Sequence, residues 1–194
     1  MILNTIGIGA LLLFIVIALS YETEWAKSLD AWAAQTFEGN AFLEAFHVIG
    51  NTETISMITL LFALFLIIRK KAWKAALFSV IVVAIGYGLN QELKAVFERA
   101  RPDIVDQLTS FSFPSGHSMS TTVCLLTLVF VTQQQFFKHS KLYWLYALAF
   151  ITAVLVALSR VAEARHFFTD ITAGVSLGLV IVIAATFFYK RLVR

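Results

Sequence analysis

Residues 171–189 read ITAGVSLGLVIVIAATFFY and contain no charged side chain. An α-helix rises about 1.5 Å per residue, so about 20 apolar residues cross the hydrocarbon core of a bilayer, and this stretch is long enough to do so. Similar apolar stretches precede it at residues 3–20, 54–68, 75–89, 118–132 and 142–158. The sequence therefore predicts an all-α integral membrane protein built as a bundle of six transmembrane helices.

The composition supports the same class. Hydrophobic residues make up 59% of the 194 residues and charged residues 14%, whereas a soluble domain carries roughly 25% charged residues. With two prolines and nine glycines, the chain has no tract typical of a linker or a disordered tail. We therefore expect a single membrane-embedded domain over residues 1–194.

The first apolar stretch has a second interpretation, a cleaved signal peptide. No basic residue precedes it, and residues 18–21 lack the small-residue pattern of a cleavage site. We expect it to be retained as a helix. The lone cysteine, Cys124, lies in an apolar run, so no internal disulfide can form, and a small buried side chain is expected there.

Basic residues gather in alternate connecting segments. They follow the second, fourth and sixth stretches, as Arg69, Lys70, Lys71, Lys74, Lys138, Lys141, Lys190, Arg191 and Arg194. None of the twelve acidic residues falls there. Because loops rich in Lys and Arg stay in the cytoplasm, we expect a multi-pass plasma-membrane protein with both termini cytoplasmic and the other loops outside.

The first outer loop, residues 21–53, contains an amphipathic segment over about residues 21–50. Its apolar side chains recur at helical spacing, as Trp25, Leu29, Trp32, Ala33 and Phe37. Such a segment either lies along the outer membrane interface with its aromatic rings at headgroup depth or packs over the helix bundle. The sequence leaves both possibilities open.

Polar residues concentrate at the outer ends of the last four predicted helices. Lys94 and Arg101 are two helical turns apart, so on a continuing helix both point the same way, ahead of Pro102. Taken alone, Lys94 or Arg99 would be expected to extend toward lipid headgroups. As a pair on one face, Lys94 and Arg101 suit a ligand with two negative charges.

A turn and a histidine pair complete this polar cluster. Residues 114–117 read PSGH and lead into a helix, whose free amides and positive end favour an anion. His166 and Asp170 are four residues apart, so the carboxylate can hold one imidazole nitrogen and leave the other as a nucleophile. His117 could then protonate a leaving oxygen. Together, the cations, the turn and the two histidines predict phosphoryl transfer.

These motifs resemble the signature of the type 2 phosphatidic acid phosphatases, the membrane branch of a superfamily that also includes vanadium haloperoxidases. The signature appears in the family's order as K-x6-RP at residues 94–102, PSGH at 114–117 and SR-x5-H-x3-D at 159–170. Each part matches without a gap or a substitution. The six-span layout extends the resemblance beyond residues 94–170.

The resemblance implies a role for each matched residue. His166 would be the nucleophile that forms a phosphohistidine, Asp170 would orient it, and His117 would be the general acid. The residues expected to bind the phosphoryl oxygens are Lys94, Arg101, Ser115, Gly116 and Arg160. The resemblance implies neither a metal nor another cofactor, and the nearby Glu163 and Arg165 are interpreted as loop charges or headgroup contacts.

Within the family, the chain is most similar to the bacterial phosphatidylglycerophosphate phosphatase B type. The resemblance allows phosphatidylglycerophosphate or undecaprenyl diphosphate as substrate, and an active site at the outer face suits the second. The expected partners are a lipid substrate and the bilayer, with no nucleic acid and no obligate protein partner. The rival interpretation is an anion transporter or binding protein that uses the same cations without covalent chemistry. It does not account for the histidine pair and Asp170.

Overall fold

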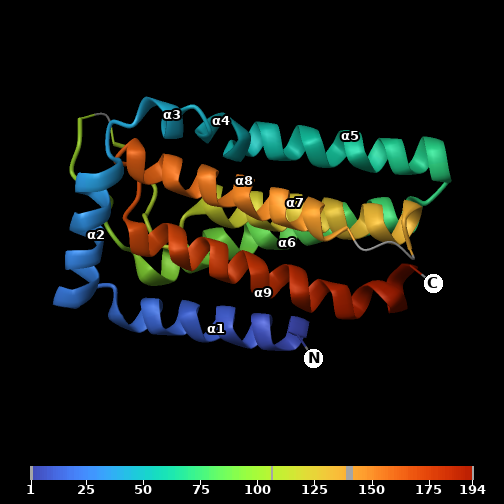
Figure 1. Ribbon diagram of the computed structural model, residues 1–194, viewed down its shortest axis with the longest axis horizontal. Coiled ribbons are helices and arrows are strands. Elements are labelled where there is room, and N and C mark those ends of the chain that lie inside the picture. Colours follow the sequence, from blue (N-terminus) through green and yellow to red (C-terminus); the bar gives the residue numbers. More distant parts are fainter. Residues whose placement is uncertain (1, 106, 139–141, 194) are drawn as a thin grey trace.

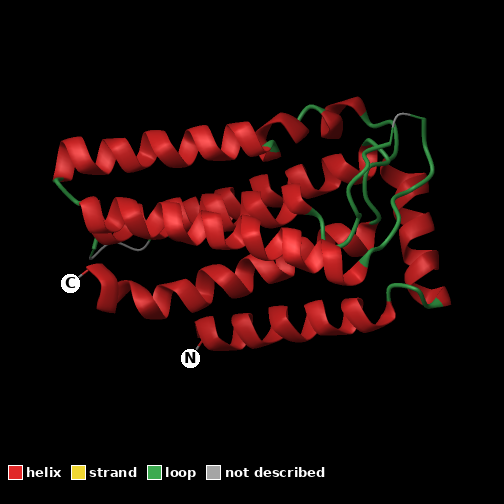
Figure 2. Ribbon diagram, turned by 180° about the vertical axis from the view of Figure 1, so that it is seen from behind, coloured by secondary structure: helices red, strands yellow, loops and turns green. Residues whose placement is uncertain are grey.

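The structure is a computed structural model that describes residues 2–105, 107–138 and 142–193, and within these ranges every regular element is a helix (Figure 2). Of the basic residues that predict sidedness, Lys141 and Arg194 lie outside the described residues. The helices are α1 (Ile2–Ser20), α2 (Glu24–Phe37), α3 (Ala41–Glu44), α4 (His47–Gly50), α5 (Thr52–Lys70), α6 (Trp73–Phe97), α7 (Gly116–Phe136), α8 (Tyr143–Ala162) and α9 (Phe168–Val193).

The long helices α1, α5, α6, α7, α8 and α9 run along one axis, and α2 crosses the end of this bundle (Figure 1). Helix α7 is central, since it packs against α5, α6, α8 and α9, whereas α1 packs mainly on α9. Both chain ends lie toward the end of the bundle opposite α2 (Figure 1). The polar motifs lie at the α2 end, where α6 and α8 finish and α7 and α9 start.

Among the described residues, hydropathy identifies 5 helices that are long and apolar enough to cross a membrane: α1, α5, α6, α8 and Phe168–Tyr189 of α9. The prediction of membrane helices is confirmed at these places. The predicted segment 118–132 is helical within α7, but α7 does not reach the same hydropathy. Its polar Ser118, Thr121 and Thr122 are fully buried, because neighbouring helices rather than lipid surround them.

The helices extend beyond the apolar stretches that predict them. Helix α6 continues past residue 89 to Phe97, where Glu98 adopts a left-handed conformation (φ 48°) and ends it. Helix α5 likewise ends before Lys71, which has a φ of 52°. A capping conformation, and not the last apolar residue, therefore sets each of these ends. The extra turns of α6 carry Lys94 into the polar end of the bundle.

Two glycines let α9 approach α7 closely. A Cβ atom at Gly174 would lie 2.6 Å from the carbonyl oxygen of Ser115, and one at Gly178 would lie 2.8 Å from Cβ of Thr122. Any larger residue would push the two helices apart. This close contact brings the start of α9, with Asp170, against the turn that begins α7.

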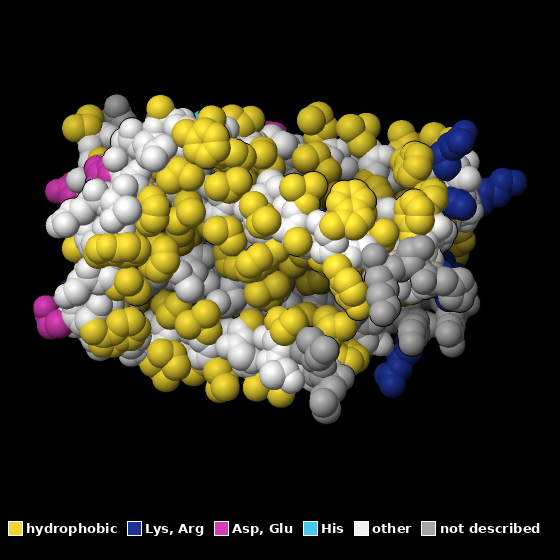
Figure 3. Space-filling model, in the orientation of Figure 1, with side chains coloured by type: hydrophobic (Ala, Val, Ile, Leu, Met, Phe, Trp, Pro, Cys, Tyr) yellow, Lys and Arg dark blue, Asp and Glu magenta, His cyan; other side chains and the backbone are white. Residues whose placement is uncertain are grey.

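Charged side chains on the face shown in Figure 3 lie near the two ends of the molecule. In Figure 3, Lys and Arg gather at one end, Asp and Glu lie at the other, and hydrophobic side chains cover most of the surface between them. The α5–α6 connection, with Lys70 and Lys71, belongs to the basic end. The acidic end is that of α2, which buries Ala26, Asp30 and Ala33 and packs on α8 and α9.

Candidate active site

A cavity of about 270 Å³ lies at the α2 end of the bundle. Its lining includes most of the residues that the sequence nominates: Lys94, Arg101, Gly116, His117, Arg160 and His166. The other two, Ser115 and Asp170, are fully buried, and the Ser115 amide donates to the Asp170 carbonyl at 3.1 Å. The fold therefore gathers residues from the ends of four helices and their connections into one site.

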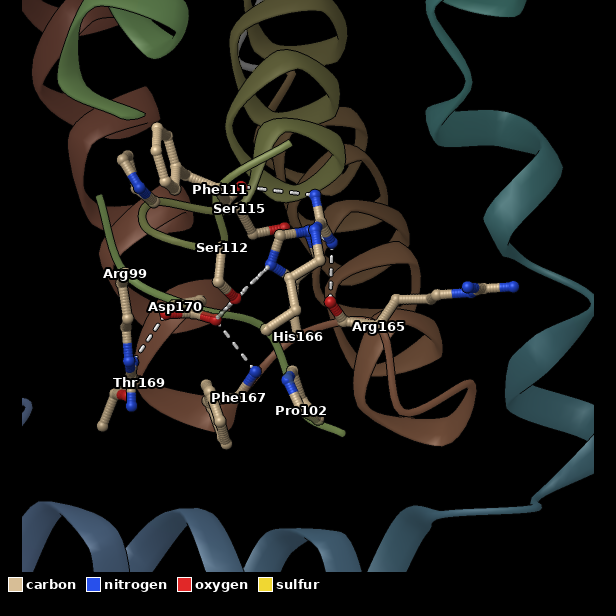
Figure 4. Close-up of polar contacts among 12 residues, drawn as sticks. Arg99, Pro102, Phe111, Ser112, Ser115, Arg165, His166, Phe167, Thr169 and Asp170 are labelled. Carbon is tan, nitrogen blue, oxygen red and sulfur yellow. Dashed lines mark hydrogen bonds and ion pairs between the residues drawn. The ribbon is translucent and has the colours of Figure 1, made fainter. Parts of the chain in front are cut away.

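The His166 imidazole is held at both nitrogens (Figure 4). Its Nδ1 lies 3.4 Å from Asp170 Oδ2 and 3.3 Å from the Ser112 hydroxyl, while Nε2 lies 3.1 Å from Nη1 of Arg101. Arginine can only donate, so Nε2 carries the lone pair and Nδ1 the proton. Burial, aided by nearby Arg101 and Lys94, lowers the pKa of His166 to about 3 against the opposing pull of Asp170, so the ring is neutral at neutral pH.

The Asp170 carboxylate is fully buried and has a partner on each oxygen (Figure 4). Oδ1 accepts from Arg99 Nη1 at 2.6 Å. Oδ2 accepts from the Phe167 amide at 2.9 Å and from the Ser112 hydroxyl, and it faces His166. These contacts fix the direction in which the carboxylate meets the imidazole.

The cations Lys94 and Arg101 donate hydrogen bonds to backbone carbonyls around the cavity. Lys94 Nζ donates to the Phe111 carbonyl at 2.6 Å, and Arg101 Nε donates to the Ser110 carbonyl at 2.6 Å. Burial, with a further contribution from Arg160, lowers the pKa of Arg101 to about 10, so its guanidinium stays charged at neutral pH. Both side chains are thus positioned before any anion arrives.

Arg160 lines the same cavity from the end of α8. Its Nη1 pairs with Glu163, which also pairs with His47 Nδ1 at 2.9 Å. Glu163 therefore makes a structural ion pair with Arg160 and is more than a loop charge. Nε of Arg160 is buried and has no hydrogen-bond partner among the described residues, so it can serve an acceptor that enters the cavity.

Hydrogen bonds of the Ser115 and Asn90 side chains stabilise the PSGH turn. Ser115 caps α7, since its hydroxyl accepts from the Ser118 amide at 3.5 Å. Asn90 on α6 donates through Nδ2 to the Pro114 carbonyl at 3.1 Å, and its Oδ1 would lie 3.0 Å from a Cβ atom at Gly116. Glycine thus leaves room for Asn90. Asn90 is not among the residues that the sequence motifs mark, although it precedes Lys94 by one helical turn on the same face.

A hydrogen bond to a residue next to α5 holds the His117 side chain. Its Nε2 donates to Oδ1 of Asn51 at 3.0 Å, and Asn51 immediately precedes α5. The imidazole lines the cavity together with His166, so the two histidines share one cavity. Asn51 is a second residue that the sequence did not nominate, and no motif or spacing marks it.

Arg99 differs from the expectation for an isolated cation at a helix end. Its side chain is only 10% exposed and pairs with Asp170 at 2.6 Å and with Asp30 of α2 at 2.8 Å. Because two buried carboxylates neutralise it, Arg99 has no need to reach the headgroups. The interpretation of Arg99 as a headgroup contact is therefore wrong.

Comparison with known proteins identifies the family. Residues 75–194 match the family model described as the PAP2 superfamily. The chain belongs to this family. The resemblance based on the signature motifs is confirmed, and all three motifs of this PAP2 protein lie within the matched region.

Two named proteins are similar to this chain in sequence. The chain is 37% identical over 131 residues to phosphatidylglycerophosphatase B of Bacillus subtilis, over 64% of this chain and 63% of that protein. It is 30% identical over 121 residues to undecaprenyl-diphosphatase of Sulfolobus acidocaldarius, over 58% of this chain and 54% of that one. The chain thus spans less than two thirds of either relative.

The fold is also similar to a solved one. A crystal structure described as the first transmembrane PAP2-type phosphatidylglycerolphosphate phosphatase from Bacillus subtilis superposes with a TM-score of 0.88. The match covers 97% of this chain and 98% of that chain at 26% identity. With its apolar helices, this likeness identifies the PAP2 protein as a membrane protein.

Proposed function

We propose that this PAP2 protein is a lipid phosphate phosphatase that removes a terminal phosphate through a phosphohistidine on His166. The observation that carries the proposal is the His166 imidazole. One nitrogen meets Asp170 and Ser112, the other faces Arg101, and the ring lines a cavity with three cationic side chains. A bare anion-binding site needs no such polarised nucleophile, so the geometry favours catalysis over transport.

In the first step, Nε2 of His166 attacks the terminal phosphorus, and the bond from phosphorus to the lipid oxygen breaks. Lys94, Arg101 and Arg160 donate to the equatorial oxygens, and the unpartnered Nε of Arg160 gains an acceptor. Asp170 stabilises the positive charge that develops on the imidazole. His117 gives a proton to the departing oxygen, so the lipid leaves in its protonated form.

In the second step, water attacks the phosphohistidine. His117, now without its extra proton, accepts one from that water, and the bond between phosphorus and Nε2 breaks. Inorganic phosphate leaves and His166 returns to its neutral form. Each group ends in its starting protonation state, and no metal or other cofactor takes part.

We propose phosphatidylglycerophosphate, giving phosphatidylglycerol, or undecaprenyl diphosphate, giving the monophosphate, as substrate. The names of the Bacillus and Sulfolobus relatives support these two lipids. We further propose that α7 is a sixth span, that both termini are cytoplasmic, and that the site faces outward from the plasma membrane. The separation of charge between the two ends supports this orientation (Figure 3).

The test is phosphate release by the purified protein in detergent with excess EDTA. Phosphatidylglycerophosphate, undecaprenyl diphosphate and phosphatidic acid are offered in parallel to the wild type and to His166→Ala. We expect release from at least one lipid by the wild type only, and the relative rates identify the preferred substrate. The thermal midpoint of His166→Ala in detergent controls for folding. No release from any lipid, or release that needs an added metal, contradicts the proposal.

A further inference from the structure

A buried ion-pair chain connects α2 to the catalytic carboxylate. We propose that Asp30 and Arg99 are positioning residues that orient Asp170 and set the charge beside His166; this inference rests on the proposed phosphohistidine chemistry. Arg99 Nη1 lies 2.6 Å from Asp170 Oδ1, and Arg99 Nη2 lies 2.8 Å from Asp30 Oδ2. Neither Asp30 nor Arg99 belongs to the positions that define the three motifs.

The geometry of Asp30 is fixed by the first turn of α9. Its Oδ1 accepts from the Thr169 amide at 2.8 Å, and its Oδ2 accepts from the Thr169 hydroxyl at 2.9 Å. Thr169 directly precedes Asp170. The side chain of Asp30 is only 6% exposed, and the flanking Ala26 and Ala33 bury the same face of α2. The carboxylate therefore belongs to the packed contact between α2 and α9.

The guanidinium of Arg99 is equally constrained. Its Cζ lies 4.2 Å from the centroid of the Phe167 ring and 4.8 Å from that of Tyr21. Its Nη1 also donates to the Thr169 hydroxyl at 2.7 Å. With aromatic rings near its cationic centre and carboxylates at its edges, the group has one favourable orientation. In Figure 4, Arg99 approaches Asp170 from the side opposite His166.

The charges explain why both residues are needed. The charges of Asp170 and Arg99 alone would sum to zero. That pair would therefore give little stabilisation to the His166 imidazole when it becomes cationic on phosphorylation. Asp30 adds a second negative charge, so the three groups together keep one net negative charge next to His166. Arg99 meanwhile favours the ionised form of Asp170, so the Nδ1 proton stays on the imidazole.

A cavity beside Arg99 allows the role of its guanidinium group to be tested directly. A second cavity, of about 570 Å³, is lined by Arg99 and Asp30 and reaches His166. Truncation of Arg99 would enlarge this cavity and leave two buried carboxylates without their cation. A free guanidinium ion is small enough to enter and has the shape and charge of the missing group.

The experiment compares Arg99→Ala, Asp30→Asn and the control Glu24→Gln in phosphate release from the preferred lipid. Glu24 lies on the same helix as Asp30, but its side chain is 93% exposed. We expect kcat to fall roughly 10- to 100-fold in the first two variants, with KM within about twofold of wild type, because a small misplacement of the nucleophile is costly. Glu24→Gln keeps the wild-type kcat.

Guanidinium chloride at sub-denaturing concentration should restore part of kcat to Arg99→Ala and none to Asp30→Asn. If Arg99→Ala does not fold, Arg99→Lys tests the same point, since it keeps the charge but not the two-sided contact, and its kcat should still fall. Wild-type kcat in Arg99→Ala and Asp30→Asn, or a loss that follows the thermal midpoint and resists guanidinium, overturns the inference alone. A wild type that hydrolyses no lipid phosphate overturns the proposed function as well.

Discussion

At the scale of single residues, the two histidines of the site differ in what holds them. His166 contacts a carboxylate at Nδ1 and a guanidinium at Nε2, which leaves a neutral ring with its lone pair at Nε2. His117 instead donates through Nε2 to the neutral side-chain amide of Asn51. A fixed charge on each side of the His166 ring suits a nucleophile.

This difference predicts distinct defects. His166→Ala should abolish turnover and the covalent intermediate, because no other group replaces Nε2. His117→Ala should slow turnover about 10²- to 10⁴-fold and mainly impair departure of the lipid. The measurement traps phosphoenzyme by alkaline quench and compares the lipid with an aryl phosphate, whose leaving group needs no proton.

In His117→Ala, the aryl phosphate should lose much less rate in the phosphorylation step than the lipid does. The wild type and Asn51→Ala provide the reference, since Asn51→Ala keeps the ring but removes its acceptor. Phosphoenzyme that disappears in His117→Ala and persists in His166→Ala would reverse the two assignments.

At the scale of elements, α7 and α9 form the frame of the site. The PSGH turn starts α7, Asp170 lies in the first turn of α9, and the amide of Ser115 donates to the carbonyl of Asp170. Gly174 lies one turn beyond Asp170 and allows this approach. The distance between the phosphate-binding turn and the nucleophile's carboxylate is therefore set by helix packing.

Gly174→Ala should consequently damage both stability and activity. The added Cβ would meet the Ser115 carbonyl oxygen at 2.6 Å, so the helices must separate. We expect a loss of about 1–3 kcal/mol, as for other overpacked sites, and a lower kcat. Thermal midpoint in detergent and phosphate release measure the two effects.

Gly88→Ala on α6 is the matched control, because no neighbouring atom of the described residues lies within 4 Å of a Cβ atom there. Its thermal midpoint and kcat should stay close to those of the wild type. Equal behaviour of the two alanine variants would mean that the α7–α9 contact is not tight enough to control the site.

At the scale of the whole molecule, the sequence predicts the helices and the motifs better than the contacts between helices. Apolar stretches and helical spacing are local signals, so the long helices and the meeting of Lys94, Arg101 and His166 could be predicted. Asp30 contacts Arg99 across 69 positions of sequence, and no periodic pattern encodes such a pair. Asn51 is 66 positions from His117 in the sequence, and only the folded bundle brings the two together.

The separation of charge between the two ends of the molecule leads to a prediction about its orientation in the membrane. Lys71 follows α5 at the basic end, and Lys27 lies on α2 at the acidic end; both are exposed. Because basic segments stay in the cytoplasm, a membrane-impermeant maleimide should label Lys27→Cys in intact cells and Lys71→Cys only after permeabilisation. Cys124 is fully buried and should remain unlabelled in the wild type, which is the control. Both variants must still release phosphate, and labelling in the opposite order would place the site on the cytoplasmic side, where phosphatidylglycerophosphate would reach it without crossing the bilayer.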